Sequence, residues 1–143
     1  MKSILAPLSA ALLLSACAAT PPAHRGFDQD GLPMAVKVPP GHQVALETVG
    51  AGQITYECRM KAGQPGAFEW AFVGPKADLR SRTGQQLGTY FGPPATWAAS
   101  DGSAVTGAQV AIAPAGPGSI PLQLVKANPA TGQGAMNGVA YIQ

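Results

Sequence analysis

Few side chains in this 143-residue sequence are of types that carry out chemistry, and they are scattered along the chain. Glu57 and Glu69 lie in two neighbouring runs where polar and apolar residues alternate, and a pair of carboxylates suits acid–base hydrolysis of a glycoside. Asp101 in the Asp-Gly-Ser turn is a third acid for such chemistry. Carboxylates on the polar face of a strand are also ordinary solvated groups, so a secreted hydrolase is here the alternative function.

Histidine, serine and cysteine form no recognisable catalytic or metal-binding pattern. A serine or cysteine nucleophile needs a base within reach, and only His42 supplies an imidazole in the predicted domain. His42 has no second ligand at helical or CxxC-like spacing, and His24 lies in a proline-containing N-terminal segment. We therefore expect no catalytic residue, no metal site and no cofactor.

Aromatic residues offer a different chemistry, that of binding. Tyr90 opens the segment Tyr-Phe-Gly-Pro-Pro, and Trp97 follows shortly after it. Together with His42, these residues are the candidate surface for a protein, glycan or lipid ligand. The alternative is that Tyr90 and Trp97 are core residues, because large aromatic side chains dominate small β cores.

Cys17 is the cysteine with the clearest sequence context. Leu14-Ser15-Ala16-Cys17 ends a short apolar run that follows Lys2, and this run is well below the ~20 residues that span a bilayer as a helix. The pattern resembles a bacterial lipobox, in which the cysteine sulfur receives diacylglycerol and the leader is cleaved before it. We expect residues 1–16 to be a lipoprotein signal peptide and Cys17 to carry the lipid. Ordinary cleavage within Ala16-Cys17-Ala18 would instead give a secreted protein.

The expected location is the cell envelope, with the membrane as a partner through the lipid. An aspartate after the lipidated cysteine resembles an inner-membrane retention signal, and Ala18 stands there instead. This favours the outer membrane, with the domain facing the periplasm. If Cys17 is lipidated, Cys58 has no partner in the chain, and we expect it to be a small buried residue.

Charge excludes a nucleic-acid partner. Removal of residues 1–16 takes away Lys2 and no acid, so the formal charge falls from +2 to 8 − 7 = +1, and no basic stripe is present. The largest basic cluster, Lys76, Arg80 and Arg82 around Asp78, is typical of a solvated loop face rather than a phosphate site.

The segments that must position these residues are predicted to be strands, because apolar and polar residues alternate along them with a period of two. Residues 17–33 contain prolines, glycines and small polar residues and predict a flexible tether, followed by a β-rich domain over residues 34–143. Residues 54–60 and 68–73 alternate between apolar and polar and flank a Gly- and Pro-containing turn, which predicts a hairpin with one buried face. A preceding strand is expected over 44–48, and later strands over residues 87–91, 96–99, 104–112, 120–126 and 139–142.

Many short strands separated by turn signals predict an all-β fold, an antiparallel β-sandwich or small β-barrel, with little or no helix after the signal peptide. Gly107 within a strand-like run indicates a bulge, and Pro121 indicates a strand start or an edge position.

Several of these segments together resemble a family. The matching segments are Ile54–Arg59, Phe68–Val73, Ala77–Leu79, Tyr90–Pro93, Trp97, Ser100–Ser103, Val105–Gly107, Gly118–Pro121 and Tyr141–Gln143. In this order they resemble the secreted family called domain of unknown function 3455, from about Leu32 to the C-terminus. The interval between Pro93 and Trp97 is longer than the family's usual one. The family often has a second cysteine beyond the position of Gln143, so the resemblance assigns Cys58 no disulfide partner in this chain.

The family has no established activity, so the resemblance implies a domain and not a reaction. We expect an envelope lipoprotein whose β domain is a non-enzymatic binding or structural module. An inhibitor of envelope-directed enzymes is the other alternative beside the hydrolase.

Overall fold

The computed structural model describes residues 27–143, so the predicted signal peptide and Cys17 lie outside the described residues. The described elements are one 3-10 turn, η1 (Met34–Val36), and the strands β1 (Val49–Met60), β2 (Phe68–Arg80), β3 (Gln86–Phe91), β4 (Thr96–Ala99), β5 (Ala104–Ala113), β6 (Leu122–Ala127) and β7 (Tyr141–Ile142). Within residues 27–143, no helix has the length and apolar character needed to cross a bilayer. The predicted all-β class is confirmed.

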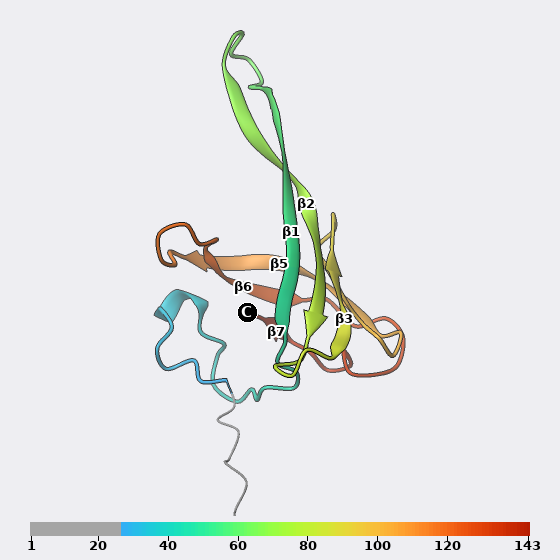
Figure 1. Ribbon diagram of the computed structural model, residues 1–143. Helices are drawn as coiled ribbons and strands as arrows, with labels where there is room; N and C mark the ends of the chain where they lie inside the picture. The colour runs from blue at the N-terminus through green and yellow to red at the C-terminus, as the bar shows by residue number, and fades with distance from the viewer. Residues whose placement is uncertain (1–26) are drawn as a thin grey trace, which may run out of the picture.

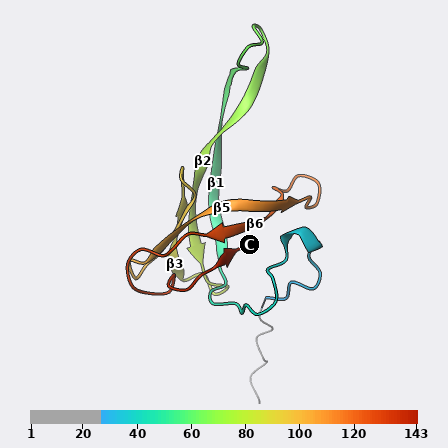
Figure 2. The same cartoon turned by 180° about the vertical axis from the view of Figure 1, so that it is seen from behind.

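The seven strands form one sheet whose spatial order is the chain order, and every neighbouring pair is antiparallel. Strands β5 and β6 run across the direction of β1 and β2 (Figure 1), and the view from behind shows the same crossing (Figure 2). The sheet does not close into a barrel, because the edge strands β1 and β7 pair only with β2 and β6. Such a meander needs only short connections between neighbouring strands.

The principal core lies where η1 packs on β5 and β6. Val36 of η1 is buried with Ala113 and Leu124, and partly buried apolar residues surround them. The preceding segment takes part in this packing, since Leu32 contacts the cluster and the Gln29 side chain accepts a hydrogen bond from the Val38 amide (2.8 Å). This cluster therefore sits at one end of the strand order and contains no residue of β1 or β2, although Ala71 and Leu79 of β2 are buried elsewhere in the domain.

Two local predictions were wrong, and both errors concern strand partners. Residues 44–48 are not a strand, because β1 begins opposite the last residue of β2 at the pair Val49 and Arg80, and the chain before it has no neighbour to pair with. The bulge predicted at Gly107 falls instead between Gln109 and Ala111, and Gly107 pairs regularly with Ala127. The expectation for Pro121 is confirmed, since it directly precedes β6.

β2 extends seven residues beyond its predicted end, through Gly74 and Pro75 to Arg80. A register shift between Thr55 and Tyr56 of β1 lets the ladder continue past this point. Gly74 is required because a Cβ there would lie 2.3 Å from the Gly92 carbonyl oxygen, in the turn between β3 and β4. The Gly-Pro pair therefore marks a close backbone approach inside a strand and not a strand end.

Candidate binding surface

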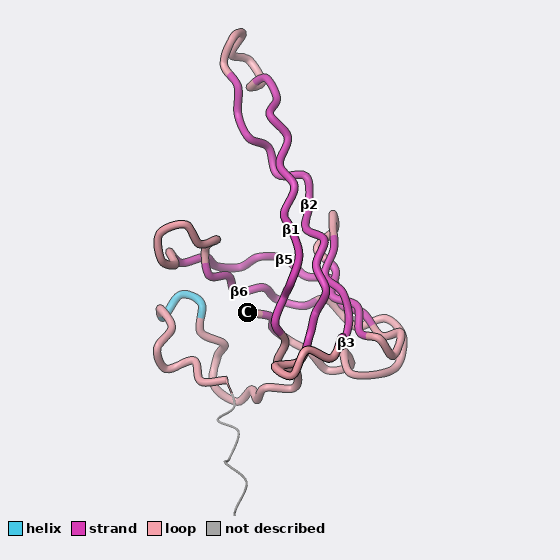
Figure 3. The backbone as a smooth tube through the Cα atoms, in the orientation of Figure 1, coloured by secondary structure: helices cyan, strands magenta, loops and turns pink. Residues whose placement is uncertain are grey.

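The hairpin of β1 and β2 is the element that stands out from the rest of the sheet. Its strands contain 12 and 13 residues, whereas β3, β4 and β6 contain 6, 4 and 6. Because β3 pairs with β2 only from Lys76 onward, the outer half of the hairpin has no third strand beside it. Figure 1 and Figure 3 show this outer half extending well beyond the other strands.

One face of this outer half is apolar. Its side chains come from three directly opposed cross-strand pairs, and we call them the hairpin face: Tyr56 with Phe72, Cys58 with Trp70, and Met60 with Phe68. Tyr56 and Phe72 contact each other edge to face, with ring centroids 5.9 Å apart. Such aromatic cross-strand pairs stabilise an isolated hairpin.

The hairpin face is exposed. Trp70 is 73% accessible and Phe68 is 62% accessible, and the other large apolar members are about half exposed. The predicted hairpin and its alternation are confirmed, but the prediction that its apolar face is buried was wrong, because no other element covers it. Cys58 is likewise exposed and free, which corrects the expectation of a buried thiol. A contiguous apolar surface of this kind on a folded domain marks an interaction site.

The opposite face of the hairpin is polar and carries the acids considered for hydrolysis. Glu69 stands opposite Arg59, and Glu57 stands opposite Ala71 one step further along the ladder. Both glutamates are exposed on this open strand surface. They line neither the pocket of about 330 Å³ bounded by Ile112 and Pro121 nor the pocket of about 230 Å³ beside Asp101.

Asp101 has a structural role, because its carboxylate accepts three hydrogen bonds from other residues. Its Oδ1 accepts hydrogen bonds from the Ser103 hydroxyl (2.6 Å) and amide (2.9 Å), and its Oδ2 accepts from the Ala135 amide (2.7 Å). The Ser103 hydroxyl in turn accepts from the Met136 amide (3.1 Å). The hydroxyl donation, followed by the two amide donations, lowers the pKa of Asp101 below its ordinary value.

A shallow pocket of about 230 Å³ lies beside Asp101. Its lining is Leu46, Gln85, Gln86, Leu87, Ala99, Ser100, Asp101 and Ala135. This lining has no second carboxylate and no imidazole, so the pocket does not bring together the two acids that glycoside hydrolysis requires.

The three residues of the predicted aromatic ligand surface make two separate aromatic contacts, one between Tyr90 and Trp97 and one between His42 and Tyr141. Tyr90 and Trp97 are cross-strand partners on β3 and β4, half-buried, with stacked rings whose centroids lie 4.6 Å apart. This partial burial raises the pKa of the Tyr90 hydroxyl. His42 instead packs edge to face on Tyr141 of β7 (5.0 Å), with Nδ1 3.0 Å from the Pro39 carbonyl oxygen. The ligand role of these three residues stays a prediction.

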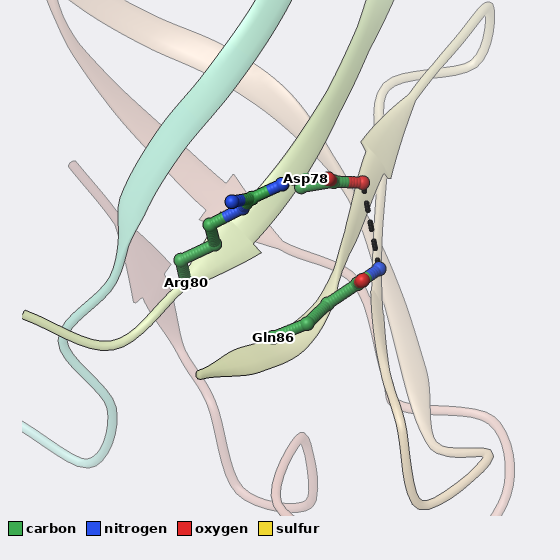
Figure 4. Close-up of polar contacts among 3 residues, drawn as sticks. All are labelled: Asp78, Arg80 and Gln86. Atoms are coloured by element: carbon green, nitrogen blue, oxygen red, sulfur yellow. Dashed lines mark hydrogen bonds and ion pairs between the residues drawn. The ribbon is translucent and has the colours of Figure 1, made fainter. Parts of the chain in front are cut away.

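The basic cluster lies at the end of β2 and not wholly in a loop. Arg80 donates to Asp78 (2.7 Å). The Gln86 amide of β3 donates to the same carboxylate (3.4 Å), which is the dashed line in Figure 4. Arg82, just after the strand, is hydrogen-bonded and ion-paired with Glu47. Because both arginines already have carboxylate partners, this surface presents no concentrated positive charge.

Among residues 27–143, no group of three His, Cys, Asp or Glu side chains is arranged to hold a metal ion. The exposed hairpin face was missed by sequence reasoning, which treated every apolar alternation as a sign of burial. Strand length could not have revealed it, because the sequence predicts strands over 54–60 and 68–73, whereas β1 and β2 contain 12 and 13 residues.

The described residues thus define an all-β domain with a projecting amphipathic hairpin. The family model described as "Protein of unknown function (DUF3455)" matches residues 39–143, and the chain belongs to this family. No curated protein and no solved structure matches the chain.

Proposed function

We propose that this protein is an envelope lipoprotein whose domain binds a partner without catalysing a reaction, and that the hairpin face is its binding surface. The observation that carries the proposal is the exposure of four aromatic side chains, together with Met60 and Cys58, on one face of a projecting hairpin. Burying such side chains in a partner is the main source of affinity at protein interfaces.

The anchor part of the proposal rests on the lipobox pattern before Cys17. Several acyl chains hold a protein firmly to a membrane, whereas one chain binds marginally. In this account Cys17 carries the lipid and the domain works at the membrane surface, facing the periplasm. Globomycin-sensitive palmitate labelling is the expected result, and a Cys17→Ser form that remains membrane-bound would refute it.

Binding is tested by co-purification from solubilised envelopes. The wild-type chain should retain a specific partner that Trp70→Ser loses, since truncation of a central aromatic residue removes an interface anchor. Glu69→Gln is the matched control, because it changes the adjacent residue on the opposite face and should retain the partner. Equal recovery by all three forms would contradict a role for the hairpin face.

The inhibitor alternative would use the same projecting hairpin of β1 and β2, which would insert into the active-site cleft of a target enzyme. Lysozyme and protease inhibition assays separate it from simple binding. The hydrolase alternative draws no support from the arrangement of Glu57, Glu69 and Asp101, because the Asp101 carboxylate already accepts three hydrogen bonds and its pocket contains no second acid.

A further inference from the structure

We infer that the occupant of the hairpin face is a second copy of this chain, so that two hairpins pack face to face in a two-fold dimer. This inference rests on the proposal that the hairpin face is a binding surface, and it names the partner. In a two-fold interface the same residues contact one another from both sides, so an apolar patch is complementary to its own copy.

The exposed area matches what a dimer needs. Trp70 and Phe68 are 73% and 62% accessible, and Tyr56, Met60 and Phe72 are 49%, 58% and 56% accessible. At about 150–250 Å² per aromatic side chain, the exposed part of the hairpin face amounts to roughly 600 Å² in each copy. Two copies would together bury about 1,200 Å², which reaches the lower end of the range for stable interfaces.

Charge favours a second copy over a membrane surface. The hairpin face contains no carboxylate, ammonium, guanidinium or imidazole group that burial would leave without a partner. Its polar groups are the Tyr56 hydroxyl and the Cys58 thiol. On the back of the hairpin Arg59 stands opposite Glu69, Glu57 lies one pair further along on the same face, and Lys61 follows β1 at the tip. Two acids and two bases balance there, unlike the Lys- and Arg-rich face of a segment that binds anionic lipid. The formal charge of +1 for residues 17–143 causes little repulsion between copies.

Geometry places one thiol of each copy near the centre of this interface. The pair Cys58–Trp70 lies between the pairs Tyr56–Phe72 and Met60–Phe68. A two-fold axis through the middle of the patch therefore passes close to Cys58 in both copies. Packed sheets lie about 10 Å apart, so the two thiols are within reach of a thiol-specific cross-linker of about that length.

The test uses the full chain with Cys17→Ser, in which Cys58 is the only thiol. Sedimentation equilibrium should give twice the chain mass, and a bismaleimide spanning about 10 Å should join two chains. Moving the thiol to the opposite face, with Cys58→Ser and Arg59→Cys, should abolish the cross-link without preventing dimerisation. Adding Trp70→Ser should weaken the dimer by about 30-fold or more, because a central aromatic anchor is lost, while Glu69→Gln leaves it unchanged.

A monomer at all concentrations with no Cys58 cross-link would overturn the inference, and the cross-link decides even if Trp70→Ser fails to fold. If the monomer instead co-sediments with phosphatidylethanolamine–phosphatidylglycerol vesicles, the occupant is a membrane and the dimer is refuted. If the monomer co-purifies with another envelope protein that Trp70→Ser loses, the dimer fails but the proposed function stands. If none of these is observed, both fail.

Discussion

Ser103 is the most informative single residue for stability, because its fully buried hydroxyl connects two segments. The hydroxyl donates to Asp101 and accepts from the Met136 amide, so it ties the turn before β5 to the segment before β7. Ser103→Ala should lower the free energy of unfolding by about 1–3 kcal/mol, since the Met136 amide loses its acceptor in a buried position. Chemical denaturation measures this value.

Ser100→Ala provides the control, because Ser100 lies in the same turn and its side chain is exposed. An equal loss in both variants would mean that the turn responds to any change and not to the loss of the Ser103 hydrogen bonds.

Asp101 should make stability depend on pH on the acid side. Its pKa is lowered in the folded state by the Ser103 hydroxyl and by the Ala135 and Ser103 amides. A group whose folded pKa is depressed contributes stability above its unfolded pKa, near pH 4, and loses it as the pH falls through the folded pKa. The difference in melting temperature between wild type and Asp101→Asn should therefore be largest above about pH 4 and shrink below it. A difference that grows on acidification would contradict this assignment.

Among the elements, the hairpin depends on a close approach at Gly74. A Cβ at this position would lie 2.3 Å from the Gly92 carbonyl oxygen, whereas nothing lies within 4 Å of a Cβ at Gly50 on β1. Gly74→Ala should destabilise the domain by about 1–3 kcal/mol, as overpacking does. Gly50→Ala should change stability much less. Thermal unfolding of both variants checks this, and equal effects would show that the approach of the β3–β4 turn does not matter.

The same hairpin shows what an alternating pattern can and cannot predict. Alternation at residues 54–60 and 68–73 predicts strands correctly, because side chains in a strand point to opposite faces in turn. It does not say what covers the apolar face, since this depends on how far neighbouring strands extend. Here β3 pairs with β2 only from Lys76, so Cys58 and Trp70 remain exposed.

For the molecule as a whole, the all-β class could be predicted from turn signals and periodicity, whereas the order of the strands, a single meander, could not. The candidate site could not be predicted either. The sequence leaves Tyr90 and Trp97 open between a ligand surface and the core, and they are half-buried partners. It predicts that the apolar face with Phe68 and Trp70 is buried, and this face is exposed. Individual side chains do not reveal on which side of a sheet the small core forms. Here it forms under η1, against β5 and β6.

The central claim, that the hairpin face is the binding surface, is tested most directly by photo-cross-linking in intact cells. A benzophenone amino acid replaces Phe68 on the hairpin face or, as the matched control, Glu69 on the opposite face. We predict a discrete covalent adduct from position 68 and none from position 69, with twice the chain mass if the partner is a second copy. No adduct from position 68, or equal adducts from both positions, would contradict the account.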